Sequence, residues 1–179
     1  DGKGLNLFDY AGAKANALGS IKAYLKDLQE VDPAKLGRDE QFAYWANLYN
    51  AKTIEVVVEA YPVDSIRKIS IDGGLFGFLK KSAGLAGPWK AKIIKVSGTE
   101  LSLDDVEHEI MRKVFADPRV HYSVNCASIG CPNLRTSAFT GANLQTELDA
   151  GAVEFINHDR GIAVDDSGNV TASSIFSWF

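Results

Sequence analysis

His121, Cys126 and Cys131 are the residues whose types and spacing point most directly to chemistry. Cys126 follows His121 by five positions, and Cys131 follows Cys126 by five more. A cysteine acts as a nucleophile in its thiolate form, which a neighbouring imidazole can generate while a carboxylate orients that imidazole. We therefore interpret Cys126 as a candidate nucleophile and His121 as its base. Glu40 is the expected carboxylate partner of the imidazole, with Glu107 as the alternative.

The same two cysteines also allow a disulfide between Cys126 and Cys131. Closing so short a loop gives little entropic stabilisation, so a purely stapling role is the weaker explanation. A structural or redox-active bridge in an oxidising compartment remains open. We expect no metal and no cofactor, because three histidines far apart and two thiols at this spacing form no recognised zinc pattern.

A helix predicted over residues 39–60 has apolar residues on nearly all of its surface. Ile54 and Val58 lie opposite its main apolar face, so polar residues such as Glu40 and Asn47 would be enclosed with it. An enclosed polar group without a partner costs roughly 1–3 kcal/mol. Such residues are therefore either satisfied structural groups or the lining of a site. The main apolar face consists of Phe42, Trp45, Ala46, Tyr49, Thr53, Val56 and Val57.

A second helix, predicted over residues 103–115, carries a carboxylate inside its apolar arc. Glu107 falls within that arc and should have a partner, while His108 lies at its edge, one turn before Arg112. The arc consists of Leu103, Val106, Ile110, Met111 and Val114. The residues that we expect to bind a substrate or ligand are Asn47, Asn50, Asn125, Glu107 and His108.

The run 119–125 alternates apolar and polar residues, which predicts a half-buried strand. His121, Ser123 and Asn125 would share one face of that strand, with Cys126 at its end. Residues 127–132 then turn sharply, so the Cys126 sulfur is expected to reach back toward His121.

The remaining patterns predict a single α+β domain over residues 1–179. Helices would pack on a small, mostly antiparallel sheet, with a helical extension over residues 1–37 and a core over 38–179. The expected elements are a helical segment over 8–31 divided near Gly19, an irregular loop over 72–89 with at most a helical turn at 76–80, strands at 91–96 and 100–103, a helix from 140 or 141 to 157, and a hairpin pairing 162–164 with 170–172.

Composition narrows the classes of partner. Hydrophobic residues make up 46% of the 179 residues and charged residues 23%, as in a globular domain. The net charge of −4 comes from interspersed charges, which argues against binding nucleic acid. The apolar runs fall well short of the ~20 residues that span a bilayer. The chain begins at Asp1, as a mature or trimmed protein would, and this allows export. A small molecule or a peptide is the expected partner.

Several long motifs in a fixed order resemble those of the domain of unknown function family numbered 547 (DUF547). They are FAYWANLYNA at 42–51, LSLDDVEH at 101–108, DPRVHYSVNCAS at 117–128, the pair Cys131-Pro132, and the closing SIFSWF at 174–179. The resemblance extends from about Asp39 to the last residue. It implies that Asn47, Asn50, Glu107, His108, His121, Asn125, Cys126 and Cys131 belong to the family signature.

The resemblance also implies a location. Members of the family are mostly exported or lipid-anchored bacterial proteins, which places this chain in the periplasm or outside the cell. Members usually continue past the aromatic pair that matches Trp178-Phe179, so we expect this chain to be truncated, and any site residue beyond that pair lies outside this sequence. From the thiol chemistry, we expect the fold to resemble those of cysteine peptidases. The leading hypothesis is a thiol-dependent hydrolase or acyl transferase, and the alternative is a non-catalytic module that binds a small polar, peptide or thiol ligand.

Overall fold

A computed structural model describes residues 4–72, 78–81 and 87–178 of the chain. It is built from helices and small antiparallel sheets, which confirms the predicted α+β class. In chain order the elements are α1 (Tyr10–Asn16), α2 (Leu18–Glu30), η1 (Pro33–Lys35), α3 (Arg38–Ala60), η2 (Ile66–Lys68), β1 (Ile69–Asp72), β2 (Phe78–Lys81), β3 (Ile94–Val96), β4 (Thr99–Leu101), η4 (Asp105–Phe115), α4 (Val120–Ser123), α5 (Leu144–Ile156), β5 (Ile162–Val164), β6 (Val170–Ala172) and η5 (Ser174–Ser177).

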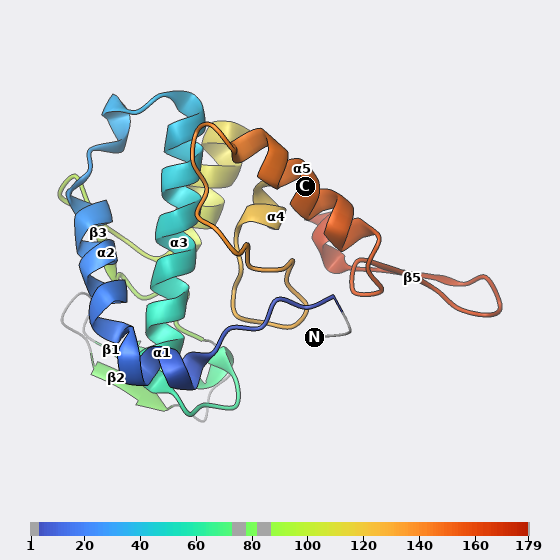
Figure 1. The fold of residues 1–179 in the computed structure, drawn as a ribbon, viewed down its shortest axis with the longest axis horizontal. Helices are drawn as coiled ribbons and strands as arrows, with labels where there is room; N and C mark the ends of the chain where they lie inside the picture. The colour runs from blue at the N-terminus through green and yellow to red at the C-terminus, as the bar shows by residue number, and fades with distance from the viewer. Residues whose placement is uncertain (1–3, 73–77, 82–86, 179) are drawn as a thin grey trace.

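The long helix α3 is the centre of the structure, and the other long helices pack around it (Figure 1). Helices α1 and α2 lie against one side of α3, while η4 and α5 contact it elsewhere. Two residues outside the main apolar face, Leu48 and Val58, are also fully buried. At 100° per residue, Val58 lies on the same side of the helix as Asn47 and Ile54. The prediction that this helix is enclosed nearly all round is confirmed from Phe42 to Val58, whereas the expected enclosure of Glu40 is wrong, because Glu40 is exposed. The break between α1 and α2 falls at Ala17, close to the expected break at Gly19.

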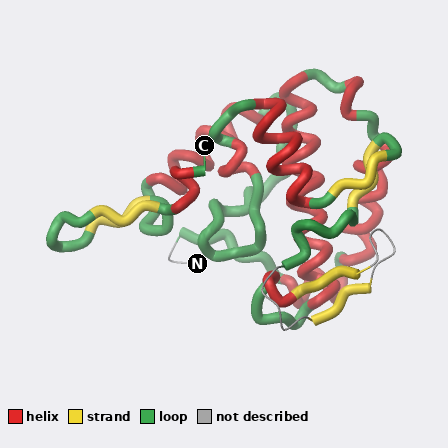
Figure 2. Tube along the Cα trace, turned by 180° about the vertical axis from the view of Figure 1, so that it is seen from behind, coloured by secondary structure: helices red, strands yellow, loops and turns green. Residues whose placement is uncertain are grey.

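The described strands form three separate two-stranded antiparallel sheets. In the β5–β6 hairpin Ile162 pairs with Ala172 and Val164 with Val170, as the sequence predicts. This hairpin projects away from the helical body (Figure 2). The pair β3–β4, whose strands also have three residues each, contacts α2 through β3.

The interpretation of residues 72–89 as an irregular loop with at most a helical turn holds for residues 87–89 but is wrong for residues 78–81. Phe78–Lys81 is strand β2, paired with β1 in a register that sets Ile71 opposite Leu79. Ile69 and Ile71 alternate with a serine and an aspartate, a strand pattern that the surrounding glycines obscured. Residues 73–77 and 82–86 lie outside the described residues.

The second predicted helix forms, but as a π-helix over Asp105–Phe115. Its hydrogen bonds link residues five apart, so its turns are wider than those of an α-helix. The apolar face therefore shifts by one residue: Phe115 is buried in place of the predicted Val114, which is 52% exposed. Leu103, Val106 and Met111 are fully buried, as expected.

The predicted strand over residues 119–125 is wrong, because Val120–Ser123 is a short helix, α4. Asp117 starts this turn: its carboxylate accepts a hydrogen bond from the Arg119 backbone N–H at 2.9 Å, and its carbonyl accepts one from Val120. Pro118, whose ring fixes φ, lies just before the N-cap residue Arg119. His121 and Ser123 are both buried, yet they do not share the face of a strand. The chain becomes extended at Val124, just before Cys126.

Candidate functional site

One cavity of about 640 Å³ gathers most of the residues with chemical potential. Its walls come from α3, η4, the segment between α4 and Pro132, and the segment 173–178. Glu107, His108, His121, Cys126 and Cys131 all line it. The sequence patterns therefore identified residues that the fold brings together, although the predicted strand does not exist. We call this cavity the Cys126 cavity.

The Cys126–Cys131 pair forms a disulfide in the wall of this cavity. We call residues 126–131 the disulfide loop. Ala127 lies in the left-handed region at φ 58°, which is uncommon for a residue other than glycine. Asn125 stabilises the loop from both ends, since its side chain donates to the carbonyl of Pro132 at 2.7 Å and accepts from the N–H of Ala127 at 2.8 Å. Both cysteines are half-buried, so neither sulfur is sealed in the core.

Asn50 on α3 attaches the end of α4 to the centre of the structure. Its side-chain amide donates to the carbonyl of Ser123 at 2.7 Å, and its oxygen accepts from the N–H of Asn125 at 2.8 Å. One buried side chain therefore satisfies two backbone groups immediately before Cys126. Asn47 makes the equivalent pair of bonds with the N–H and carbonyl of Phe139, at 3.0 and 2.8 Å.

Glu107 is the carboxylate that lies beside His121. One oxygen of Glu107 is 3.8 Å from Nδ1 of His121, a distance longer than a hydrogen bond. The buried hydroxyl of Tyr49, which extends from α3, donates a hydrogen bond to Glu107. Tyr49 stays protonated as this donor, because burial and the nearby Glu107 charge raise its pKa well above the ordinary value.

Burial controls the protonation of this pair. It raises the pKa of Glu107, against the opposing effects of the His108 and Arg112 charges and the Tyr49 hydrogen bond. It also lowers the pKa of His121 to about 4, with further lowering from the charges of Arg112 and His108. His121 is therefore a neutral imidazole at pH 7, and its contact with Glu107 is not an ion pair under those conditions.

Two arginines line the same cavity. Arg112 follows His108 by four residues on η4, and its Nη1 lies 3.1 Å from Nδ1 of His108, while Nη2 donates to the carbonyl of Trp178. Arg160, in the turn after α5, donates to the carbonyls of Ile129 and Cys131 in the disulfide loop, at 2.9 and 2.7 Å. The ring of Trp178 meets that of His121 edge to face at a centroid distance of 5.8 Å.

The other predicted site residues lie elsewhere. Asn47 and Asn50 line a second cavity of about 490 Å³ between α2, α3 and residues 134–139. Asn125 lines neither cavity and acts on the loop through its hydrogen bonds.

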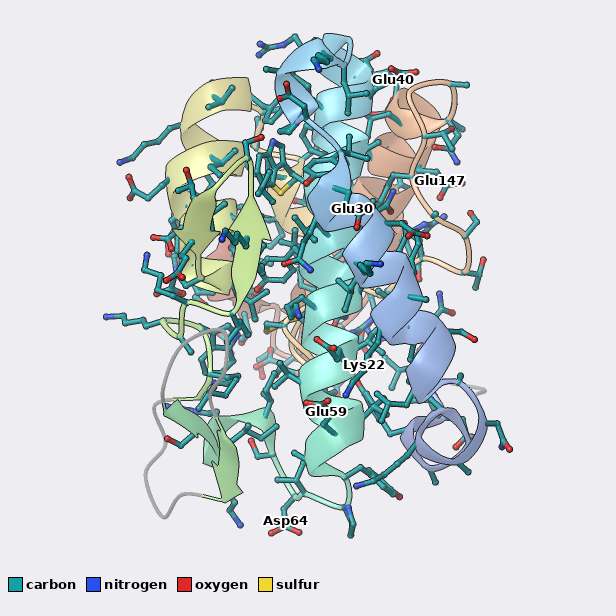
Figure 3. All side chains as sticks on the ribbon, turned by 90° about the vertical axis from the view of Figure 1, so that its left-hand side faces the viewer. Lys22, Glu30, Glu40, Glu59, Asp64 and Glu147 are labelled. Atoms are coloured by element: carbon teal, nitrogen blue, oxygen red, sulfur yellow. A yellow bond between two sulfur atoms is a disulfide. The ribbon has the colours of Figure 1, made fainter. Side chains whose placement is uncertain are left out.

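Glu40 does not reach the Cys126 cavity. It is exposed at the N-terminal end of α3 (Figure 3), where its side chain packs against Gly141 so closely that a Cβ at position 141 would lie 2.7 Å from it. Nine residues, or about 13 Å of helix, separate Glu40 from Tyr49. Glu107, the alternative partner, occupies the position that the sequence interpretation gave to Glu40.

Sequence reasoning overlooked three residues of the cavity. Tyr49 was assigned to the core face, where it does lie, yet its hydroxyl supports Glu107. Arg112 was noticed only as a neighbour of His108, although its position one turn away was a usable signal. Arg160 follows an Asn-His-Asp loop with no pattern around it, so nothing in the sequence connected it with the cysteines.

A family model described as "Protein of unknown function, DUF547" matches residues 33–156, which is more than half of the chain. The chain therefore belongs to the DUF547 family. No curated protein and no solved structure matches it, so the expected likeness to cysteine-peptidase folds stays a prediction. The closing SIFSWF segment lies beyond the matched residues.

Within residues 4–72, 78–81 and 87–178, no three histidine, cysteine or acidic side chains are grouped as metal ligands would be. No helix in that part of the chain combines the length and apolar character needed to cross a membrane.

Replacing Asn50 by alanine should lower the free energy of unfolding by about 1–3 kcal/mol, because a backbone carbonyl and a backbone N–H lose their buried partner. Asn50→Asp should also destabilise, since a carboxylate cannot donate to the Ser123 carbonyl. Urea unfolding measures both. The control is Asn157→Ala, whose exposed amide bonds only to its own helix. Equal effects of Asn50→Ala and the control would contradict the assignment.

Lowering the pH from 6.5 toward 4 should destabilise the parent protein more steeply than the His121→Asn variant. The pKa of His121 is about 4 when folded and 6.5 ordinarily, so between these values the unfolded chain binds a proton that the folded chain does not. Above pH 6.5 the titration of His121 does not affect the free energy of unfolding. Below pH 6.5 it lowers that free energy by up to about 1.4 kcal/mol per pH unit, until His121 is also protonated in the folded state.

The raised pKa of Glu107 stabilises the folded protein as the pH falls over part of this range. The test therefore compares the pH dependence of the unfolding free energy in the parent with that in the His121→Asn variant. Urea unfolding at several pH values should give a shallower slope for His121→Asn. Asn157→Ala, which replaces an exposed residue without a titratable group, should keep the parent slope. Identical slopes in the parent and His121→Asn would show that His121 titrates normally.

Proposed function

We propose that the protein is a thiol-dependent hydrolase or acyl transferase whose active form is the reduced one. Cys126 is the nucleophile, His121 is the base and Glu107 orients the imidazole. The observation that carries this proposal is that all three side chains line one cavity, with Glu107 3.8 Å from Nδ1 of His121. Catalytic contacts of this kind are often long in an unliganded site and shorten with substrate.

The disulfide makes the structure described here a latent form of such an enzyme. A dithiol reductant would attack one sulfur, and its second thiol would then release both cysteines as thiols while the reductant becomes a cyclic disulfide. Only after this exchange does Cys126 have a thiol to ionise. Its half-buried position in the cavity wall is compatible with access by a small reductant.

The chemical step then follows ordinary acyl transfer. His121 takes the proton of the Cys126 thiol, the sulfur bonds to the acyl carbon, and the leaving group departs with the electrons of its broken bond and regains the proton. Water or another acceptor then attacks the thioester and gives its proton to His121, and the sulfur of Cys126 departs as the thiolate. Glu107 stabilises the imidazolium that forms in between, while Tyr49 keeps the carboxylate in place.

A non-catalytic binding module is the second candidate, and the disulfide itself favours it. In the oxidised protein the cavity offers polar groups and no reactive thiol. A disulfide persists most readily in an oxidising compartment, which supports the proposed periplasmic or secreted location. For this candidate, a small polar molecule or a peptide would occupy the same cavity.

Acylation by an activated phenyl ester separates the two candidates. In the reduced Cys131→Ser variant, the ester should transfer its acyl group to Cys126 and then lose it by hydrolysis, as followed by the mass of the intact protein. Adding His121→Asn should slow acylation at least about a hundredfold, the lower range for loss of a positioned base.

His158→Asn is the matched control and should leave the rate of acylation unchanged. Cys126→Ser should remove rapid acylation altogether. Acylation that is equally fast with and without His121 would exclude the proposed enzyme. Complete resistance of Cys126 to the ester would also reject it and favour the binding module.

A further inference from the structure

Arg160 is a half-buried cation whose recorded partners are all neutral. Its Nη1 donates to the carbonyls of Ile129 and Cys131, and its Nη2 donates to the side-chain oxygen of Asn133 at 3.0 Å. Its guanidinium lies over the ring of Phe155 at 5.8 Å. No ion pair found among the described residues includes Arg160. The nearby Glu154 is instead paired with Arg135, at 2.8 Å.

This environment leaves Arg160 with unused capacity to bind an anion. A guanidinium has five N–H groups in a planar fork, and the three recorded bonds use three of them. Its buried Nε makes no hydrogen bond within the part of the chain that the structure describes. Charges removed from water are normally paired, because neutral acceptors alone compensate poorly for lost hydration.

Arg112 adds a second guanidinium to the same cavity from a different element. It lies on η4, whereas Arg160 follows α5, so the fold brings together cations 48 positions apart in the chain. The contacts of Arg112 include the His108 ring and the Trp178 carbonyl. Two arginines that converge on one cavity are a usual arrangement for binding carboxylate or phosphate oxygens.

The acidic residues of the cavity favour a singly charged ligand. Asp104 and Glu107 also line it, and any negative charge on these carboxyl groups would repel a phosphate with close to two charges more strongly than a single carboxylate. Val124, Pro132 and Ile175 supply apolar wall beside the arginines. A volume of about 640 Å³ is within the usual range for small-molecule sites.

We propose that the Cys126 cavity recognises small acyl compounds or short peptides that carry a free carboxylate, and that Arg160 and Arg112 bind that carboxylate. This inference names the ligand class of the site described under the proposed function, and it rests on that proposal for the site's role. The disulfide loop is part of the recognition, because Arg160 is oriented by the carbonyls of Ile129 and Cys131.

Titration calorimetry on the oxidised protein, which has no free thiol and cannot turn over, tests the inference. The probes are N-acetyl-alanyl-alanine, its C-terminal amide and inorganic phosphate. The acid should bind at least tenfold more tightly than the amide and than phosphate. Arg160→Gln and Arg112→Gln should each reduce the affinity for the acid at least tenfold, with little change for the amide.

Arg135→Gln is the matched control, because Arg135 is also half-buried but pairs with Glu147 and Glu154 outside this cavity. It should leave the affinity for the acid unchanged. Arg160→Gln could disturb the loop, so the Arg112 variant provides an independent test. Absence of binding by the acid, equal affinity for acid and amide, or tighter binding of phosphate would overturn the proposal.

The two proposals fail separately. Carboxylate binding by the oxidised protein without acylation of reduced Cys126 would reject the enzyme and keep the ligand class. If Cys126 is acylated but the acid and the amide bind equally, the proposed enzyme is supported and the proposed recognition of a free carboxylate is rejected.

Discussion

The side-chain amide of Asn50 is the constraint on which the site depends. Asn50 is buried on the central helix and pairs with the carbonyl of Ser123 and the N–H of Asn125, so it determines where α4 ends and the disulfide loop begins. The next residue toward the N-terminus, Tyr49, supports Glu107 from the same helix. Two adjacent residues of α3 therefore set the positions of the sulfur and of the carboxylate relative to each other. A side-chain amide suits this role because it can both donate and accept a hydrogen bond, as the backbone of a neighbouring strand does in a sheet.

Removal from water, more than ion pairing, sets the protonation of His121 and Glu107 inside the site. Burial holds His121 neutral and opposes ionisation of Glu107, while Arg112 provides positive charge at the edge of the cavity. A neutral imidazole next to a carboxylate can accept a proton and then gains an ion pair with that carboxylate. In our proposal this gain accompanies ionisation of Cys126, and the disulfide keeps the system inactive until a reductant opens it.

Elements with a strong apolar pattern or clear turn residues were predictable from the sequence, and the others were not. The enclosure of most of α3 and the need for a partner at Glu107 followed from hydrophobic periodicity, and the β5–β6 hairpin followed from the turn residues at 166–169. Residues 119–125 misled because a two-residue alternation over seven positions also fits one helical turn and an extended end, and the Asp117 hydrogen bonds decide between them. Val114 was wrongly placed on the apolar face because a π-helix shifts that face by one residue. No residue pattern in this segment indicates a π-helix. Whether Glu40 and Arg160 line the cavity is decided by the tertiary structure, and the residues next to them in the sequence do not indicate it.

The thiol pKa of Cys126 in the reduced Cys131→Ser variant tests the central claim most directly, and the ultraviolet absorbance of the thiolate across a pH series measures it. Our account predicts a pKa clearly below the ordinary cysteine value of about 8.5, and a rise toward that value when His121 is replaced by asparagine. A pKa at or above about 8.5 that does not respond to replacement of His121 would contradict it, because the sulfur and the imidazole would then share a cavity without interacting.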